Sequence, residues 1–584
     1  MSELNNLKAA KTLPQFAHLL KLKSETVSYA LYWYRRRSPY SHFTISKKNG
    51  GRRHIAAPNS RLKLVQSRLA ELLGRIETEM EMKRTTKVRV LSHGFKKGFS
   101  IITNANQHRN KRWVFNVDIR DFFPSINFGR VYGFFVKDRN FQLDPKIATI
   151  IAQIACYQNR LPQGSPCSPV VSNLITHILD IKLNKLANDL HCTYTRYADD
   201  LTFSTNEKEF PEQIARLVRG NDDKWVAGDG LLYLVYRAGF QLNHEKTRMQ
   251  RRDSRQDTTG LIVNQKLNVR HEYYKQVRAM CHHLFNHGFA FSDPGKVPVS
   301  NHTVEGMLSF IYQIRRIRSQ NLVVEKEPER NSFFQTDQAG FTELYRRFLN
   351  YRSFYGMIKP TIICEGKTDN IYLLAAIRKL APKFPKLIDP AQKLPLKVQF
   401  FNYSHRSALF QGLSGGGDEM YKLIKDFRER MKFFKHVPTQ PVIMIIDNDA
   451  ASTGIFTYVG TVHGTGPVSG LDPFYHVFEN LYIVPVPTTA GVKAVIEDLF
   501  DPVVKKPISG RTFNSSNKSF DQTKFYGKNE FATKIVAPER ATIDFTKFEP
   551  LLQAICDVMD HFAATLAAKS IVLPAPVVVA EAAP

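Results

Sequence analysis

Two adjacent aspartates, Asp199 and Asp200, lie where two apolar segments meet, in the stretch 194–204 that reads YTRYADDLTFS. Neighbouring carboxylates repel each other and do not help packing, so the pair is costly unless it is solvated at a turn or bound by a cation. A third acid, Asp118, lies near the end of the buried-strand pattern at 113–119 (WVFNVDI). Carboxylates in such a set hold two Mg²⁺ ions for phosphoryl transfer. We therefore predict that Asp118 and Asp199 are shared metal ligands and that Asp200 supports them.

A second set of acids follows two other apolar segments. Residues 361–369 (TIICEGKTD) read as a strand, then Glu365, then a helix start, and residues 442–449 (VIMIIDND) read as a buried strand that ends in Asp447 and Asp449. In a parallel sheet both strand ends open on the same carboxyl edge. The pattern predicts that these three acids converge on one or two Mg²⁺ ions, although the first segment alone is more typical of an ordinary strand-to-helix turn.

Charge is distributed unevenly along the chain. The 584 residues carry 82 Lys and Arg against 53 Asp and Glu, a formal charge of +29. Residues 1–350 hold 55 of the basic and 31 of the acidic side chains, whereas residues 351–584 hold 27 and 22. Such an imbalance is typical of a protein that neutralises a phosphate backbone with its N-terminal part. A soluble protein that happens to be basic is the alternative.

The elements that must position these acids form two patterns. Short apolar strands alternate with amphipathic helices up to residue 265, an α+β pattern that includes a hairpin at 43–55, and helices follow to residue 320. Strand and helix alternate again after 361, which predicts an α/β domain with a mainly parallel sheet. We expect five segments: 1–265 as the first domain, 266–324 as a helical RNA-binding segment, 325–356 as a linker and connecting helix, 357–570 as the second domain, and 571–584 as a disordered tail.

The first domain resembles the reverse transcriptases. The tetrad YADD at 197–200 resembles their catalytic tetrad, and two further blocks stand in the family's order: RLPQGSPCSPVVSNL at 160–174 and LNHEKT at 242–247. The resemblance implies a right-hand polymerase with fingers, palm and thumb. It also implies an RNA-directed DNA polymerase that binds dNTPs.

The same resemblance assigns roles to substrate-binding residues. Arg52 and Arg53 match the finger segment that grips the incoming triphosphate, and Lys246 matches the lysine near it. Phe123, five residues after Asp118, matches the aromatic residue that excludes a ribose 2′-OH. Gln163 matches the position that contacts the incoming sugar. The family therefore implies a preference for dNTPs over rNTPs.

Two blocks resemble the retron reverse transcriptases of bacteria in particular. Residues 104–108 (NANQH) match the family's N-A-x-x-H block, and residues 258–260 (TTG) stand where the family usually has V-T-G, with Thr258 replacing the valine. The resemblance implies that 266–324 is the thumb, and that the partners are a non-coding RNA serving as template and primer and its cDNA product. Priming from a guanosine 2′-OH would give branched multicopy single-stranded DNA. A host-beneficial reverse transcriptase without a dedicated RNA is a further alternative.

The second domain resembles the Toprim domains, in particular those of the OLD-type nucleases. Residues 414–418 (SGGGD) suit the glycine turn of that fold, and Lys528 matches the lysine that assists cleavage. Position 451 is Ala where acidic residues often continue, so either Glu479 or Glu497 is open as a further ligand. The resemblance implies a Mg²⁺-dependent nuclease that cuts a nucleic-acid target as an effector of anti-phage defence. The alternative is a non-catalytic module that binds nucleic acid or a partner.

Composition places the protein in a reducing, aqueous compartment. The six cysteines form no C-x-x-C pair, which argues against a zinc ribbon and against a disulfide framework. The N-terminus lacks the apolar stretch of a secretory signal, and the longest apolar run, 147–157, is too short to span a bilayer. We expect a soluble, cytoplasmic protein without a membrane partner. The oligomeric state, a homo-oligomer included, stays open.

Overall fold

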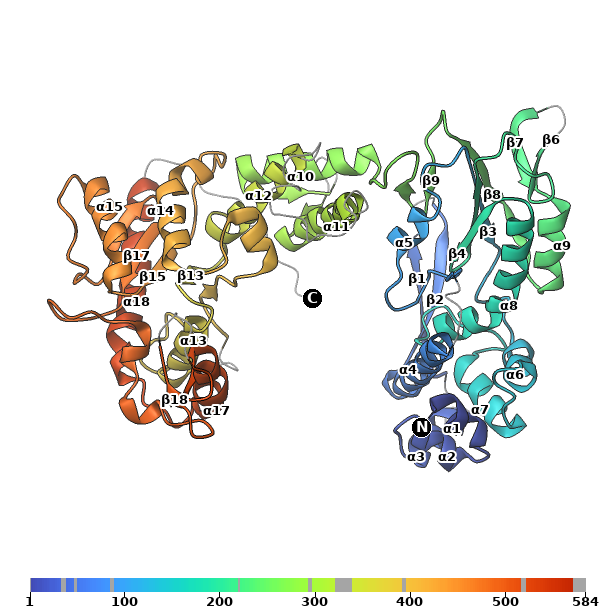
Figure 1. Cartoon of the computed structure of the whole chain (residues 1–584), viewed down its shortest axis with the longest axis horizontal. Coiled ribbons are helices and arrows are strands. Elements are labelled where there is room, and N and C mark those ends of the chain that lie inside the picture. The colour runs from blue at the N-terminus through green and yellow to red at the C-terminus, as the bar shows by residue number, and fades with distance from the viewer. Residues whose placement is uncertain are drawn as a thin grey trace. The chain divides into compact units, whose positions relative to one another are not determined.

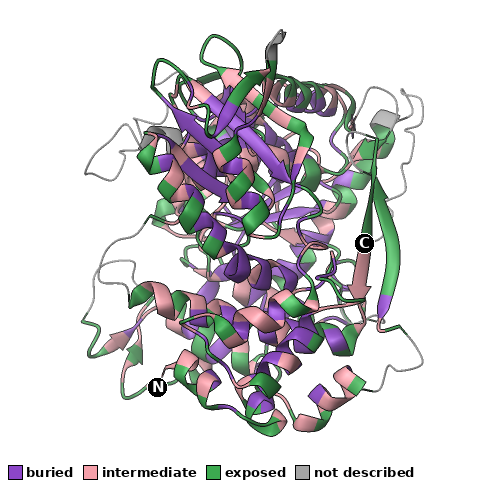
Figure 2. Cartoon of the chain, turned by 90° about the vertical axis from the view of Figure 1, so that its right-hand side faces the viewer, coloured by how far each residue is buried: buried purple, intermediate pink, exposed green. Residues whose placement is uncertain are grey.

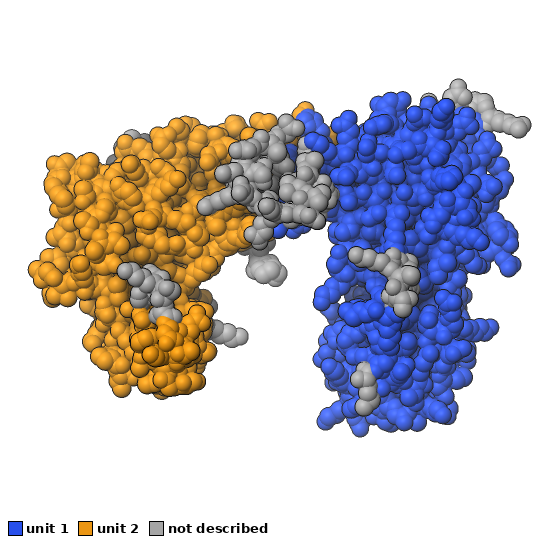
Figure 3. Space-filling view, in the orientation of Figure 1, with its two compact units in different colours: residues 1–271, 313–318 blue, residues 272–312, 319–584 orange. Residues whose placement is uncertain are grey.

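The computed structural model describes residues 2–32, 38–46, 50–83, 89–218, 221–292, 297–320, 339–390, 395–515 and 521–570. The chain forms two compact units, coloured separately in Figure 3. Unit 1 comprises residues 1–271 and 313–318, and unit 2 comprises residues 272–312 and 319–584. The tail predicted at 571–584 lies outside the described residues.

Unit 1 begins with helices and a hairpin: α1 (Glu3–Ala9), α2 (Leu13–Leu19), α3 (Ser24–Tyr32), β1 (Tyr40–Ser46), β2 (Arg52–Pro58) and α4 (Ser60–Met82). The predicted hairpin is confirmed, because β1 and β2 pair antiparallel from Tyr40 opposite Pro58 to Ser46 opposite Arg52. Residues 47–49 at its tip are outside the described ranges. β1 is exposed beyond Tyr40, as the green strand in Figure 2 shows, so most of its side chains do not enter the core.

An antiparallel sheet in the order β4-β5-β3-β8 forms the centre of unit 1 (Figure 1). Its strands are β3 (Trp113–Ile119), β4 (Thr193–Tyr197), β5 (Asp200–Thr205) and β8 (Leu242–Arg251). The surrounding helices are α5 (Ile101–Asn106), α6 (Phe128–Lys137), α7 (Pro145–Ala155), α8 (Ser168–Asp189) and α9 (Asp229–Arg237). Two small pairs are added, β6 (Ala215–Val218) with β7 (Asn221–Ala227), and β9 (Asp257–Thr258) with β10 (Leu261–Ile262). β3 is buried along nearly its whole length because a strand lies on each side of it. The predicted α+β pattern is confirmed.

The helices that follow pack differently from our expectation. We predicted a thumb at 266–324 that is separate from the C-terminal domain, but residues 272–312 belong to unit 2. They include α10 (His271–His287) and most of α11 (Asn301–Gln320), which are followed by α12 (Ala339–Phe354). Arg352 of α12 pairs with Glu305 of α11 at 2.5 Å, and Lys435 N donates to Phe285 O of α10 at 2.9 Å. These contacts, with the buried face of α12, place the expected connecting helix in the core of unit 2 rather than in a spacer. Residues 321–338 of the predicted linker are outside the described ranges.

Unit 2 is built on a five-stranded sheet in the order β14-β13-β15-β17-β16. The strands are β13 (Thr361–Cys364), β14 (Gln399–Phe400), β15 (Val442–Ile446), β16 (Tyr475–Phe478) and β17 (Leu481–Pro485). All neighbours are parallel except β16 and β17, so the mainly parallel sheet is confirmed. The three central strands are buried at every residue, which is typical of a parallel sheet covered on both faces.

Helices and short segments cover this sheet. The helices are α13 (Asp369–Lys379), α14 (Gly417–Met431), α15 (Thr453–His463), α16 (Lys528–Glu530), α17 (Ala537–Glu539) and α18 (Glu549–Ser570). One core cluster joins alternate residues of β13, β15 and β17 to apolar side chains of α13, α18 and the π-helical segment η6 (Phe531–Val536). The remaining small elements are β11 (Ala290–Phe291), β12 (Pro298–Val299), β18 (Thr512–Phe513), β19 (Phe525–Tyr526) and the turns η2 (Ser407–Gln411), η3 (Ala450–Ser452), η4 (Ile496–Leu499), η5 (Pro502–Val504) and η7 (Thr546–Phe548).

One segment of the described chain, Thr546–Ala568, is long and apolar enough to cross a membrane by length and composition, with a mean hydropathy of 1.2. A core helix of a soluble domain passes the same test. Leu551, Leu552 and Ile555 of α18 are fully buried in the core cluster of unit 2. We therefore interpret α18 as a core helix.

Candidate active sites

The three acids of the first predicted site lie together at one end of the central sheet of unit 1. Asp118 on β3 is opposite Asp200, the first residue of β5. Asp199 precedes Asp200 in the turn between β4 and β5, and its carbonyl oxygen accepts a hydrogen bond from Ile119 N at 2.9 Å. The two apolar patterns that flank the acids in the sequence are thus neighbouring strands, and their pairing brings the carboxylates together.

These acids perturb one another. Asp200 is exposed as a residue at the hairpin tip, but its carboxyl group faces the other two acids, and desolvation there together with Asp199 and Asp118 raises its pKa to about 7. Burial and the charge of Asp118 also raise the pKa of Asp199, whereas Lys246 and Arg53 lower it. Lys246 Nζ lies 2.9 Å from Asp118 Oδ2. The predicted acids and two of the predicted cations therefore face each other, and Arg52 is exposed one residue before Arg53 on β2.

The loop that contains Gln163 contacts the hairpin formed by β1 and β2. Gln163 O accepts a hydrogen bond from Ala56 N of β2 at 2.8 Å. Gly164 has a φ of +122°, and a Cβ there would lie 2.7 Å from Ala56 O, so only glycine fits. Phe123 is half-buried, with its ring centroid 6.0 Å from that of Phe95. Gln163 thus lies against the hairpin, and Phe123 packs against Phe95.

A buried ion pair beneath the acids was missed by sequence reasoning. Arg196 and Asp180 are 0% and 1% exposed, and the Arg196 guanidinium donates to both carboxylate oxygens of Asp180 at 2.8 Å. Arg196 also donates to Ala198 O at 3.1 Å. Ala198 has a φ of +57°, and Gly94 allows its close approach, since a Cβ on Gly94 would lie 2.6 Å from Ala198 N. Arg196 therefore holds the strained turn that presents Asp199 and Asp200.

We expect Asp180→Asn to lower the free energy of unfolding by about 3–5 kcal/mol, because it leaves the Arg196 charge buried without a counter-ion. Urea denaturation measures the change. Glu3→Gln is the matched control, since it breaks the exposed Arg75–Glu3 pair at 2.8 Å and should cost less than about 1 kcal/mol. Equal losses in the two variants would contradict a stabilising role for the buried pair.

The predicted acids of the second site also lie at one edge of a sheet. Glu365 follows β13 and Asp447 follows β15, and these strands are parallel neighbours with Cys364 opposite Ile445. Asp449 lies two residues further on and caps η3, where its Oδ1 accepts from Ala451 N at 2.9 Å. Burial, then Asp449 and Asp369, raises the pKa of Glu365. The three predicted acids therefore lie at the same, carboxyl edge of the sheet.

Asp369 is a further acid of this cluster that sequence reasoning treated only as part of a helix start. It is 6% exposed, and its Oδ2 accepts a hydrogen bond from Gly366 N at 2.7 Å. Burial, followed by Asp369 and Glu365, raises the pKa of Asp447 to about 7. Its position four residues after Glu365, at the start of the helix that follows the same strand, was the available signal.

Lys528 and Glu497 complete the cluster. The Lys528 ammonium lies 3.2 Å from Glu497 Oε2, and Glu497 is fully buried. Burial lowers the pKa of Lys528, but Glu497, Asp447 and Asp369 raise it above its usual value overall. Ile496 N, next to Glu497, donates to Asp447 Oδ1 at 3.0 Å. The structure thus brings Lys528 to the acids as predicted.

Strand direction separates Glu479 from Glu497. Glu479 precedes β17, which runs parallel to β15 with Leu481 opposite Val442. It therefore lies at the amino edge of the sheet, opposite the edge that carries Asp447, and our alternative of Glu479 as a ligand is wrong. The glycine turn is at the correct edge, because Gly416 N donates to Glu365 O at 3.0 Å.

Both clusters carry donor groups of the kind that bind a divalent metal ion. Among the residues that the structure describes, no group of three or more His, Cys, Asp or Glu side chains stands close enough to hold one as it is. At the first site the Lys246 ammonium contacts Asp118 directly. Even so, at each site buried carboxylates raise one another's pKa, which is the cost that a bound divalent cation removes. The carboxylate donors suit Mg²⁺, but the side chains would have to move before they could hold it.

Comparison with known proteins agrees with the geometry of unit 1. Residues 45–263 match the family model described as reverse transcriptase (RNA-dependent DNA polymerase). The retron Ec86 reverse transcriptase of Escherichia coli is 32% identical over 279 residues, which is 47% of this chain and 76% of that protein. This chain belongs to the retron reverse transcriptases.

Other retron reverse transcriptases are similar over about half of the chain. The retron Mx65 reverse transcriptase of Myxococcus xanthus is 30% identical and aligns with 50% of this chain and 64% of its own length. Among solved structures, a telomerase from Candida albicans matches with a TM-score of 0.31 and 10% identity, over 58% of this chain and 64% of its own. That TM-score is below the level at which a common fold can be argued.

The retron blocks 104–108 and 258–260 have a structural role in this reverse transcriptase. His108 is fully buried, and its ring nitrogens lie 2.7 Å from Ser204 Oγ and 2.7 Å from Thr195 Oγ1. These hydroxyls belong to β5 and β4, the two strands that flank the acid-bearing turn. The histidine therefore links β4 to β5, the two strands joined by the turn that carries Asp199.

Thr258 offers a test of the second block. It is fully buried, and its Oγ1 makes no hydrogen bond with any residue that the structure describes. Thr258→Val, which restores the usual retron residue, should keep or raise the free energy of unfolding, by up to about 1 kcal/mol. The control is Thr202→Val, because Thr202 Oγ1 donates to Asn116 Oδ1 at 3.0 Å and its loss should destabilise by about 1–2 kcal/mol. Destabilisation of both variants to the same degree in urea would oppose this interpretation.

Proposed function

We propose that this retron reverse transcriptase copies its own structured non-coding RNA into branched multicopy single-stranded DNA. We further propose that unit 2 contains a Toprim-like, Mg²⁺-dependent nuclease that acts as the effector in anti-phage defence. Membership of the retron family supports the first part. The cluster of Glu365, Asp369 and Asp447 at the carboxyl edge of a parallel sheet is the single observation that carries the second.

For DNA synthesis, Asp118 and Asp199 would hold two Mg²⁺ ions and Asp200 would support them. The ions, when bound, would lower the pKa of the primer hydroxyl and neutralise charge on the α-phosphate and the leaving pyrophosphate. Lys246 would release Asp118 and turn to the triphosphate, because it already lies at the edge of the acids. The exposed Arg52 and Arg53 of β2 would contact the triphosphate from the opposite side.

Substrate selection would depend on two further residues of unit 1. Phe123 would close the space beside the sugar, so that a ribose 2′-OH does not fit and dNTPs are preferred. Gln163 would contact the incoming sugar, since the hydrogen bond from Ala56 fixes its backbone against β2.

For hydrolysis, Glu365, Asp447 and Asp449 would hold one or two Mg²⁺ ions, and Asp369 would contribute negative charge. Lys528 would stabilise the developing charge on the phosphate or on the leaving oxygen. It is suited to this because three acids keep it protonated within a half-buried cluster. The target of cleavage is DNA or RNA, tRNA included.

The nucleic acid that co-purifies with the protein tests the retron proposal. The gene would be expressed with its flanking DNA, and the bound nucleic acid would be sequenced before and after RNase treatment. A discrete RNA joined to single-stranded DNA of one length, through a bond that survives denaturation, is the expected result. Heterogeneous cellular RNA without joined DNA would favour a reverse transcriptase that has no dedicated template.

A further inference from the structure

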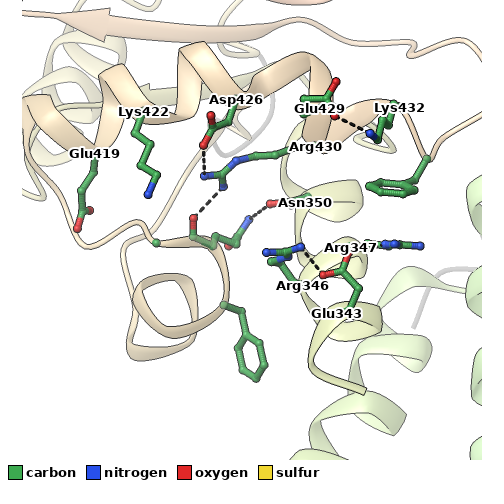
Figure 4. Close-up of a pocket in the computed structure, with 14 residues that line it drawn as sticks. Glu343, Arg346, Arg347, Asn350, Glu419, Lys422, Asp426, Glu429, Arg430 and Lys432 are labelled. Atoms are coloured by element: carbon green, nitrogen blue, oxygen red, sulfur yellow. Dashed lines mark hydrogen bonds and ion pairs between the residues drawn. The ribbon is translucent and has the colours of Figure 1, made fainter. Parts of the chain in front are cut away.

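A pocket of about 640 Å³ lies within unit 2, between α12, η2 and α14. Its lining contains five basic side chains, four acidic side chains, two phenylalanines and two amides. Figure 4 shows Lys422, Asp426 and Arg430 extending from α14 on the side that faces Arg346 and Asn350 of α12. The volume falls within the range of small-molecule sites.

The floor of the pocket presents amide groups. Asn350 and Gln411 are 3% and 4% exposed, and Gln411 Nε2 donates to Asn350 Oδ1 at 3.2 Å. A primary amide carries two donor hydrogens and an acceptor oxygen that takes two bonds, so this contact leaves hydrogen-bonding capacity on both side chains. Paired donors and acceptors are what the polar edge of a nucleobase requires.

Arg430 carries a positive charge next to these amides, and the protein neutralises this charge only weakly. Its side chain is 17% exposed, and burial lowers the pKa of its guanidinium. Arg430 donates to Gln411 O at 2.8 Å, and its ion pair with Asp426 is long, at 3.8 Å. A desolvated cation with a distant counter-ion gains from a bound anion, and a phosphate accepts the planar guanidinium fork.

One wall offers a flat surface for an aromatic ring. The Arg347 guanidinium lies 3.6 Å from the centroid of the Phe433 ring, whereas Phe410 of η2 is buried against other rings. Stacking on such surfaces is how proteins bind bases without reading their sequence.

Three of the four acids are engaged with other groups of the protein, which leaves the pocket able to accept an anion. Glu343 pairs with Arg347 at 2.6 Å, and Glu429 pairs with Lys432 at 2.5 Å. Glu419 Oε1 accepts a hydrogen bond from Ser414 Oγ at 2.7 Å.

We propose that this pocket binds a nucleoside phosphate, with its base against Asn350 and Gln411 and its phosphate on Arg430 and Lys422. The ligand is either a free nucleotide or the 5′-phosphorylated end of a strand, since both present the same chemistry. None of the residues involved belongs to the two acid clusters, so the proposal does not depend on the proposed nuclease.

Binding of nucleoside 5′-monophosphates to the full-length protein, measured by calorimetry in EDTA, tests the proposal. Monophosphates without metal avoid the triphosphate site of the polymerase. Arg430→Gln should weaken binding about ten- to a hundredfold, because it removes a charge-assisted hydrogen bond. Lys422→Ala, at an exposed position, is a second variant and should weaken it about threefold. Arg428→Gln is the matched control, since Arg428 on the same helix lies over Phe478 and does not line the pocket.

Each outcome either supports or contradicts binding in this pocket. Binding by wild type and Arg428→Gln, with weaker binding by the other two variants, supports the pocket. If Arg430→Gln lowers the melting temperature, the result for Lys422→Ala is used instead. If a 5′-phosphorylated oligonucleotide competes more strongly than both its 5′-hydroxyl form and the monophosphate, the ligand is a strand end. If the monophosphate competes more strongly than the phosphorylated oligonucleotide, the ligand is a free nucleotide. No binding to wild type at millimolar nucleotide, equal binding by Arg430→Gln and Arg428→Gln, or equal competition by inorganic phosphate would each overturn the proposal.

Discussion

Replacing Asp199 with Asn should reduce cDNA synthesis by at least roughly 10³-fold while leaving the melting temperature unchanged or higher. Under the proposed mechanism, activity falls because the variant loses a charged ligand for the ions that would stabilise the transition state, a loss of several kcal/mol. Burial and the charge of Asp118 raise the pKa of Asp199 in the folded protein. At a pH above the usual aspartate pKa, the ionised carboxylate therefore destabilises the folded state, and its replacement by a neutral amide should not lower stability. Primer extension with dNTPs and thermal unfolding measure the two effects.

Asp229→Asn is the matched control for this prediction. Asp229 lies in the same unit, on α9, and its exposed carboxylate pairs with Arg216 at 3.1 Å. Synthesis by this variant should stay within about twofold of wild type, because an exposed ion pair contributes little. Persistent dNTP incorporation by Asp199→Asn would refute the assignment of the polymerase site.

Replacing Glu365 with Gln should abolish metal-dependent cleavage by the full-length protein and leave DNA synthesis within about twofold of wild type. Glu365 follows β13 in unit 2, whereas Asp118, Asp199 and Asp200 belong to unit 1. A neutral amide at 365 removes one negative ligand from the second cluster, so the affinity for a divalent cation should fall. Assays on plasmid DNA, single-stranded DNA and total RNA with Mg²⁺, Mn²⁺ or EDTA measure cleavage.

Glu539→Gln controls for the loss of one carboxylate from unit 2, since Glu539 is exposed and pairs with Lys506 at 2.6 Å. This variant should cleave as wild type does. Joint loss of polymerisation and cleavage in Glu365→Gln would argue against two independent centres. If wild-type protein cleaves none of the substrates, unit 2 is better explained as a non-catalytic binding module.

Local sequence was sufficient to identify the acids that end strands. The apolar patterns before Asp118, Asp199 and Asp447 mark buried strands, and the alternation of strand and helix after residue 361 predicts that Glu365 and Asp447 share one edge. This works because the period of the apolar residues records which faces of an element are buried. Short polar loops at the ends of such strands are then the places where ligands bind.

Contacts between distant segments were decided only by the tertiary structure. Arg196 and Asp180 read as ordinary charged residues in the sequence, and their burial follows from the packing of β4 on α8. Glu479 and Glu497 stand in similar acidic blocks, but the direction of β17 places them at opposite edges of the sheet. The helix α10 follows the polymerase region in the sequence and yet packs in unit 2. The period of the apolar residues predicts that a face of an element is buried, but it does not identify the element that packs against this face. Long-range packing of the whole chain selects that partner.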